Sequence, residues 1–345
     1  MESVVPAGPP LEPGAFPVGH RATQLVDGSR DSRSIEIDCW YPSVPGDHPR
    51  TAYELLPGIG VTASAYEHAP PRRGTHPLVV WSHGRSGTQT AYVMLCEGLA
   101  ARGYVVAAPA HPGDTLLDWI TGTAVDDATN ERQRVADVQV VLDHLLGSET
   151  DTFDGLPVID PARVAVAGHS YGAFTAYAFA STESDRPRIR GAAGLQSLTR
   201  TIPSDDLGRI SVPLLMVTGS FDDVTPPVTD ADPAFAALAR QHIHRVDIRD
   251  AGHQGCSDVG LYLELIDQVA GVPDLVRDFV TGMAAQVTGR AGTPWRPTVT
   301  LHLRILGAWL DEVTGGDRDR AQAELAEVAA THGVAVRLTG RSAEC

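Results

Sequence analysis

The most informative stretch of this chain is Gly168-His169-Ser170-Tyr171-Gly172. It follows the apolar run Val164-Ala165-Val166-Ala167 and precedes a segment of mostly small residues, 173–180. This pattern predicts a strand, a sharp turn and a helix, and a serine on such a turn holds its hydroxyl out of the sheet. Glycines on either side let neighbouring elements approach without clashes. The stretch therefore predicts a nucleophile elbow with Ser170 at its tip.

Short apolar segments alternate with longer helical segments on both sides of this turn. The predicted strands are 78–82, 104–109, 164–167, 192–195, 213–218 and 243–248, and the clearest helices are 88–102 and 130–146. Such alternation requires crossover connections, which favour a mostly parallel, doubly wound α/β sheet with helices on both faces. In sheets of this kind the ligand site lies at the carboxyl ends of the strands.

The two ends of the chain differ in composition from this core. Residues 1–18 contain five prolines and predict a flexible arm, whereas 19–316 predict a single catalytic domain. Residues 317–345 predict a peripheral addition, with a helix over 320–332 and a short strand over 334–338.

Within the predicted domain, three regions lie outside the alternating pattern. Strand-like residues 21–26 and 34–40 flank a turn and predict an antiparallel hairpin at the sheet edge. Residues 41–77, rich in proline and glycine, are expected to run over the surface. Residues 261–287 carry apolar side chains at helical spacing and suggest a helical cover over the site, which would favour a hydrophobic small-molecule substrate.

Composition excludes several classes of protein. The formal net charge is −16, and all 27 basic residues are arginines, so a Schiff-base lysine, a P-loop lysine and a Ser-Lys dyad are ruled out. The acidic balance argues against nucleic acid or an anionic membrane as the main partner. We expect no transmembrane helix and, from the absence of a signal-peptide pattern, a cytoplasmic location. The four scattered cysteines are expected to be reduced and structural.

Four segments resemble the α/β-hydrolase superfamily, in the family's order along the chain. They are Trp81-Ser82-His83-Gly84-Arg85, residues 99–106, the turn at Ser170, and Ala251-Gly252-His253. The closer resemblance is to bacterial esterases of the dienelactone-hydrolase-like and platelet-activating-factor-acetylhydrolase-like groups, from a related lipase and polyester-hydrolase branch. It covers about 20–310. It implies a serine carboxylic ester hydrolase that uses a Ser-His-Asp triad and an acyl-enzyme intermediate, with no cofactor and no metal.

The resemblance also suggests partners for Ser170. A neutral serine needs a base within hydrogen-bonding distance, and His253 lies in a glycine-containing loop where the family carries its catalytic histidine. The acid comes between serine and histidine in this superfamily. We favour Asp222, which matches the family's spacing, over its neighbour Asp223, which would then cap a loop or face solvent.

An oxyanion requires backbone N–H donors. The resemblance assigns them to Tyr171, directly after Ser170, and to Arg85 in the His83-Gly84-Arg85 turn. The alternative is that His83 and Gly84 only form a tight turn. The side chain of Arg85 is either exposed or available to an acidic group of the substrate.

Other polar residues have weaker claims. His169 is expected to be structural, and Cys256 to pack in the core rather than act as a second nucleophile. His111 follows a strand and either lines the pocket or shapes a loop. His242 and His244 share one face of a strand, and without a third ligand they predict surface residues rather than a metal site.

Two functions remain as alternatives to ester hydrolysis. An alcohol or amine could resolve the same acyl-enzyme, which would make the protein an acyltransferase or a thioesterase of a biosynthetic pathway. The fold could also serve as a binding protein without turnover.

Overall fold

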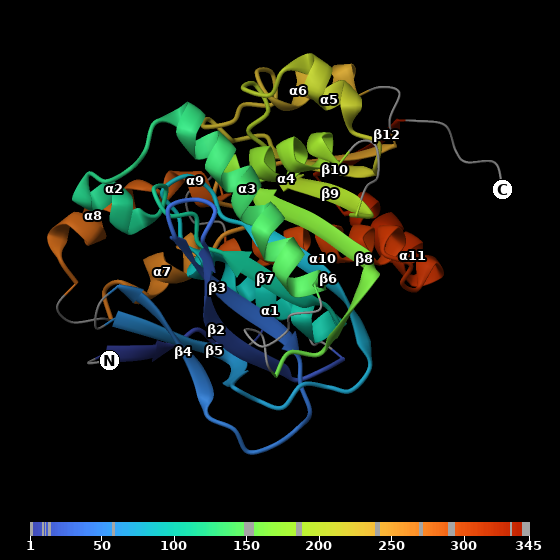
Figure 1. Cartoon of the computed structure of the whole chain (residues 1–345). Coiled ribbons are helices and arrows are strands. Elements are labelled where there is room, and N and C mark those ends of the chain that lie inside the picture. The colour runs from blue at the N-terminus through green and yellow to red at the C-terminus, as the bar shows by residue number, and fades with distance from the viewer. Residues whose placement is uncertain are drawn as a thin grey trace.

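A computed structural model shows one mixed sheet covered by helices on both faces (Figure 1). The structure describes residues 3–8, 10, 12, 15–56, 59–147, 155–183, 188–238, 242–268, 272–288, 294–331 and 333–339. The strand order is β1-β5-β2-β3-β7-β6-β8-β9-β10-β11-β12, and β4 pairs with β5. The predicted α/β class is therefore confirmed.

The bounds of the elements follow the predicted alternation closely in the centre of the chain. The strands are β1 (Ser3–Pro6), β2 (Val18–Asp27), β3 (Arg33–Pro42), β4 (Arg50–Leu56), β5 (Ile59–Glu67), β6 (Thr75–Ser82), β7 (Val105–Pro109), β8 (Val158–His169), β9 (Gly191–Leu195), β10 (Leu214–Gly219), β11 (Ile243–Ile248) and β12 (Val334–Thr339). The helices are η1 (Gln89–Tyr92), α1 (Val93–Arg102), α2 (Leu116–Thr121), α3 (Asp127–Leu146), α4 (Tyr171–Thr182), α5 (Ser204–Arg209), α6 (Ala231–Ala237), α7 (Val259–Leu265), α8 (Asp274–Gly282), α9 (Ala285–Thr288), α10 (Trp295–Val313) and α11 (Arg318–Ala330).

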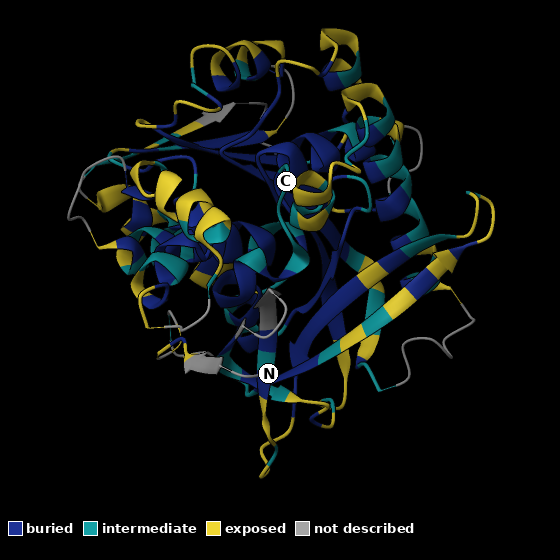
Figure 2. Cartoon of the chain, turned by 90° about the vertical axis from the view of Figure 1, so that its left-hand side faces the viewer, coloured by how far each residue is buried: buried dark blue, intermediate teal, exposed yellow. Residues whose placement is uncertain are grey.

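The central strands β7, β6, β8, β9, β10 and β11 are all parallel to one another. Successive side chains of a strand point to opposite faces, and β6 shows the consequence. Leu78 and Val80 pack in the same core as α3 and α4, whereas Val79 and Trp81 pack with α1 and α10. Figure 2 shows the centre of the sheet buried, with the exposed residues of the helices on their outer sides. A sheet buried on both faces explains the continuous apolar runs of the sequence.

The N-terminal third differs from the prediction. Strands β2 and β3 form the expected antiparallel hairpin, but β5 and β1 lie beyond β2, so the hairpin is not at the edge of the sheet. Residues 41–77 contain β4 and β5 rather than a surface path, and residues 3–6 pair with β5 rather than forming a flexible arm.

The strand signal in this region is weak because only alternate residues are buried. Thr51 and Tyr53 on β4 are buried on either side of the half-buried Ala52, and Ala65 on β5 is buried between the half-buried Ser64 and Tyr66. The surrounding prolines and glycines outweighed that pattern in the sequence.

The predicted C-terminal helix and strand are present as α11 and β12. Strand β12 pairs antiparallel with β11 and extends the sheet, and α11 is held by Arg102, which donates to Glu324 at 2.8 Å. Val328 of α11 is fully buried. His332 and residues 340–345, including Cys345, lie outside the described residues.

Two further expectations concern the cysteines and the absence of a transmembrane helix, and both agree with the part of the chain that the structure describes. Cys39, Cys96 and Cys256 are buried free thiols. None of the described helices combines the length and the apolar character needed to cross a bilayer.

Candidate active site

The turn at Ser170 is a strained connection between β8 and α4. Ser170 has φ 56° and ψ −114°, a conformation that a non-glycine residue adopts only when the surroundings enforce it. A Cβ atom on Gly172 would overlap the carbonyl oxygen of Ser82, and one on Gly168 would overlap the backbone of Gly172. The glycines therefore allow β6 to pass directly beneath the turn, which leaves the Ser170 hydroxyl at the carboxyl edge of the sheet.

Two further strands bring His253 and Asp222 to this edge. His253 Nε2 lies 2.9 Å from Ser170 Oγ, and His253 Nδ1 lies 3.0 and 2.9 Å from the two carboxylate oxygens of Asp222. All three residues are less than a tenth exposed, whereas Asp223 is exposed to solvent. The structure thus brings together the three residues favoured from the sequence, which we call the pocket triad.

Thr225 holds the carboxylate of Asp222 in place. Its backbone N–H donates to Asp222 Oδ1 at 2.8 Å and its hydroxyl donates to Oδ2 at 2.7 Å. Burial alone would raise the pKa of Asp222, but hydrogen bonds from His253 and Thr225 outweigh it and hold the pKa below its ordinary value. Asp222 is therefore ionised at neutral pH and can stabilise a positive charge on His253.

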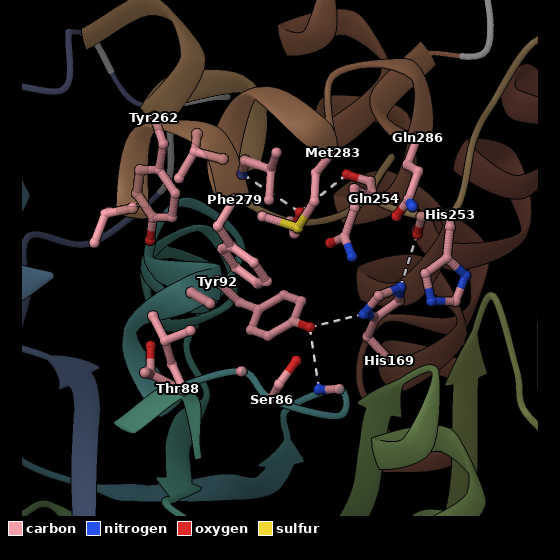
Figure 3. Close-up of a pocket in the computed structure, with 18 of the residues that line it drawn as sticks. Ser86, Thr88, Tyr92, His169, His253, Gln254, Tyr262, Phe279, Met283 and Gln286 are labelled. Atoms are coloured by element: carbon pink, nitrogen blue, oxygen red, sulfur yellow. Dashed lines mark hydrogen bonds between the residues drawn. The ribbon is translucent and has the colours of Figure 1, made fainter. Parts of the chain in front are cut away.

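His169 supports the loop that carries His253. His169 Nε2 lies 2.7 Å from the carbonyl oxygen of His253, and Nδ1 lies 2.7 Å from the hydroxyl of Tyr92. Since a carbonyl can only accept, we assign the proton to Nε2, and Nδ1 then accepts from Tyr92. The Tyr92 hydroxyl in turn accepts from the backbone N–H of Gly84 at 3.2 Å (Figure 3). One hydrogen-bonded path thus joins the Gly84 turn to the His253 loop.

Burial keeps both side chains of this path, His169 and Tyr92, uncharged. The pKa of His169 lies well below its ordinary value because of burial and the neighbouring His253, and burial raises the pKa of Tyr92 above its usual range. The expectation that His169 is structural agrees with this geometry. Tyr92 is buried and also lines the pocket.

The turn after β6 passes next to Ser170. A Cβ atom on Gly84 would lie 3.4 Å from the Cβ of Ser170, and Arg85 lines the same cavity as Ser170. Tyr171 is the first residue of α4. Its backbone N–H is therefore one of the N–H groups in the first turn that have no acceptor within the helix. Both predicted oxyanion donors therefore belong to elements that border the Ser170 hydroxyl.

A buried arginine fixes the shape of this turn. Arg134 on α3 is fully buried and donates to the carbonyl oxygens of His83 and Gly84 at 2.9 and 3.3 Å. Its charge is paired with Asp114 at 3.0 Å, and Asp114 also accepts from the backbone N–H of Ser86 at 3.3 Å. Since the turn is held from both sides, its backbone donors keep one orientation.

The side chain of Arg85 has partners within the protein. Its guanidinium lies 2.6 Å from Asp127 and stacks over the ring of Tyr171, 4.4 Å from the ring centre. The Arg85 side chain is therefore partly buried and paired rather than freely exposed, and its contact with an acidic group of a substrate stays a prediction.

A second set of serine, histidine and aspartate lies beneath the site. Ser82 Oγ is 2.8 Å from His111 Nε2, and His111 Nδ1 is 3.0 Å from Asp137 Oδ2. All three are fully buried, and we call them the buried triad. His111 therefore belongs to the structural alternative rather than to the pocket lining.

The cavity at the pocket triad has a volume of about 410 Å³ and contains Ser170 and His253. Described residues of α7, α8 and α9 form one wall, so these parts of 261–287 border the same cavity as Ser170. Figure 3 shows Tyr262, Phe279 and Met283 reaching toward Tyr92 and the turn with Ser86. The apolar side chains of this lining are Val61, Leu116, Val224, Val259, Leu265, Ile266, Val272, Val276, Phe279, Val280 and Met283.

The helices of this wall also contact the loop that carries His253. The backbone N–H of Gln254 donates to the carbonyl oxygen of Gln286 at 2.7 Å, and a Cβ atom on Gly252 would overlap that carbonyl.

Cys256 is fully buried and burial holds the pKa of its thiol well above the ordinary value, so it packs in the core as expected.

The sequence analysis missed Thr225, Arg134 and Asp137. A threonine three residues after an aspartate is a common side-chain capping pattern and was a usable signal for Thr225. Arg134 and Asp137 share the inward face of α3 with Val138 and Val141. Charges on the apolar face of a helix indicate a buried ion pair.

Comparisons with known proteins agree with this architecture. The family model described as platelet-activating factor acetylhydrolase, isoform II, matches residues 58–135. Cutinase 1 of Thermobifida cellulosilytica is 28% identical over 169 residues, which are 49% of this chain and 56% of that protein. Platelet-activating factor acetylhydrolase of Cavia porcellus is 23% identical over 269 residues, covering 60% of this chain and 59% of that one. The chain spans about half the length of the curated relatives it matches.

A solved structure matches over a longer span. The ferulic acid esterase from Streptomyces cinnamoneus superimposes with a TM-score of 0.70 at 24% identity, covering 89% of this chain and 92% of that one. This likeness extends over the sheet and the helices on both faces. The chain is therefore an α/β-hydrolase by fold, similar in sequence to cutinases and to platelet-activating factor acetylhydrolases.

Proposed function

We propose that the protein is a serine hydrolase of carboxylic esters. The observation that carries the proposal is the continuous hydrogen-bonded chain from Ser170 through His253 to Asp222 at the wall of a cavity. The similarity to cutinases and to a ferulic acid esterase supports it.

The geometry suggests a role for each residue. Ser170 Oγ attacks the ester carbonyl while its proton moves to His253 Nε2, and Asp222 stabilises the resulting imidazolium. The backbone N–H groups of Tyr171 and Arg85 stabilise the oxyanion. His253 then gives the proton to the departing alcohol, and a water molecule activated by His253 releases the acid from the acyl-enzyme.

The cavity favours an apolar acyl group. Apolar side chains such as Phe279 and Val280 make up most of its lining, and each buried methylene contributes about 0.8 kcal/mol to binding. We therefore expect esters of medium-length acids to react faster than acetate esters.

Hydrolysis of a p-nitrophenyl ester series, from acetate to palmitate, tests the proposal. We expect turnover that depends on chain length and disappears in Ser170→Ala. Ser181→Ala, at the far end of α4, is the matched control and should behave as the wild type. Equal rates for the wild type and Ser170→Ala would overturn the proposal.

A further inference from the structure

A second group of ligand-forming side chains lies away from the pocket. His242 precedes β11, His244 lies in it, and Glu312 is near the end of α10. The two Nε2 atoms are 3.1 Å apart, and His244 Nε2 is 3.9 Å from Glu312 Oε2. One ligand atom from each residue lies within 4.8 Å of the other two. The sequence showed only the two histidines, and the fold adds the carboxylate.

The convergence follows from the packing of α10 on the sheet. Residues two apart in a strand face the same side, so His242 and His244 share the face of Val246. Val246 packs in one core with Leu306 and Trp309 of α10. The last turn of α10 therefore brings Glu312 to the two imidazoles.

We propose that His242, His244 and Glu312 bind one zinc ion. Tetrahedral zinc bonds of about 2.0–2.1 Å separate neighbouring ligand atoms by about 3.3 Å. The observed distances of 3.1 and 3.9 Å require only small side-chain movements. The ligand atoms of His242 and Glu312 lie within 4.8 Å and must approach by at most about 1.5 Å to reach this tetrahedral spacing. Two imidazoles and one carboxylate are a donor set that zinc uses in proteins. His242 is exposed, which leaves room for a water molecule as fourth ligand.

The position of the site indicates a structural role. His242 and His244 are at the beginning of β11, whereas His253 follows its carboxyl end, so the two sites are on opposite edges of the sheet. A zinc ion here joins the sheet to α10. Binding to the folded state alone stabilises it by mass action.

Titration of the chelator-treated full chain with zinc chloride, followed by calorimetry, tests the proposal. We expect one zinc ion per chain and at least about tenfold weaker binding in His242→Ala and in Glu312→Gln, which removes the charge and keeps the shape. His68→Ala alters another exposed histidine and should bind as the wild type does. Absence of binding, or equal affinity in all four proteins, would overturn the proposal.

Two further readouts separate this site from the pocket. Cobalt bound in place of zinc should give visible absorption bands that are lost in His242→Ala. Ester hydrolysis by zinc-loaded and zinc-free protein should be equal, and a rate that depends on zinc would contradict the structural role.

Discussion

The pocket triad and the buried triad use the same three residue types and the same hydrogen-bond sequence, in different surroundings. Ser170 lies on a strained turn at a cavity, whereas Ser82 ends strand β6 and is fully buried. In both, a histidine bonds the serine through Nε2 and the aspartate through Nδ1. Hydrogen-bond geometry alone therefore does not define a nucleophile. The serine hydroxyl must also be accessible to a substrate, and the backbone must hold it toward the cavity.

The electrostatics of the two triads differ as well. Asp137 is bonded by His111, Arg30 and Arg33, with Arg33 Nε at 2.8 Å. Burial and the charge of Arg134 lower the pKa of His111 to about 4. A histidine with that pKa is a weak base near neutral pH. We infer that the buried triad joins β6, the residue after β7 and α3 beneath the turn formed by His83, Gly84 and Arg85. In this position it has a structural role and performs no chemistry.

The serines provide the largest expected difference between the triads. Ser170→Ala should lower kcat for a p-nitrophenyl ester by at least about 10,000-fold, since it removes the nucleophile. Ser82→Ala should stay within about tenfold of the wild type, because only a structural hydrogen bond is lost. Steady-state kinetics of both variants measure this, and a comparable loss in the two would erase the distinction.

The aspartates should separate activity from stability. Asp222→Asn should lower kcat by about 10,000-fold near neutral pH, because the imidazole loses its anionic partner. Asp137→Asn should keep most of its kcat per folded molecule and lose about 3–5 kcal/mol of unfolding free energy, because the partly buried Arg30 and Arg33 lose the buried carboxylate with which they pair. Kinetics and urea unfolding of each variant check this; an opposite pattern would mean that the roles are exchanged.

The pH dependence of stability sharpens the comparison further. The folded-state pKa of His111, about 4, is below its unfolded value, so protonation favours the unfolded chain. Its contribution is present above pH about 6.5 and is lost as the pH falls toward 4, which amounts to about 3 kcal/mol. Burial also lowers the pKa values of His83, His169 and His302, which therefore act with the same sign.

In urea unfolding between pH 7 and 4.5, His111→Gln should therefore show a shallower loss of stability than the wild type. The slope of unfolding free energy against pH reports the number of protons taken up on unfolding, and this number should differ between the two proteins by nearly one. Parallel pH curves would show that His111 is not neutral in the folded protein.

The smallest expected effect concerns the cavity, which borders only the pocket triad. Phe279→Ala removes part of the apolar wall and should change the rate ratio between octanoate and acetate esters by about tenfold. Phe16→Ala, distant from the cavity lining, is a suitable control. An unchanged ratio would place the acyl group elsewhere.

Much of this arrangement could be predicted from local sequence. Continuous apolar runs predicted the parallel strands, and the glycines around Ser170 predicted the turn. Asp222 and His253 were brought together as expected because each follows a strand of the same parallel sheet, although their catalytic roles remain predictions, as does the cellular location.

The hydrogen-bond partners that could not be predicted from the sequence come from segments that are distant in the chain. His111 pairs with Ser82 and Asp137 across three elements, and Tyr92 joins Gly84 to His169. Such partners have no local pattern. Strands β4 and β5 were missed for a different reason, because their alternating burial was outweighed by turn-forming residues.

Labelling with a fluorophosphonate tests the central claim most directly. The reagent forms a bond between phosphorus and an activated serine oxygen and releases fluoride. We predict one adduct per chain, mapped to Ser170 by peptide mass analysis, retained in Ser82→Ala and absent in Ser170→Ala. An unlabelled wild type, an adduct on Ser82, or labelling that persists in Ser170→Ala would contradict the account.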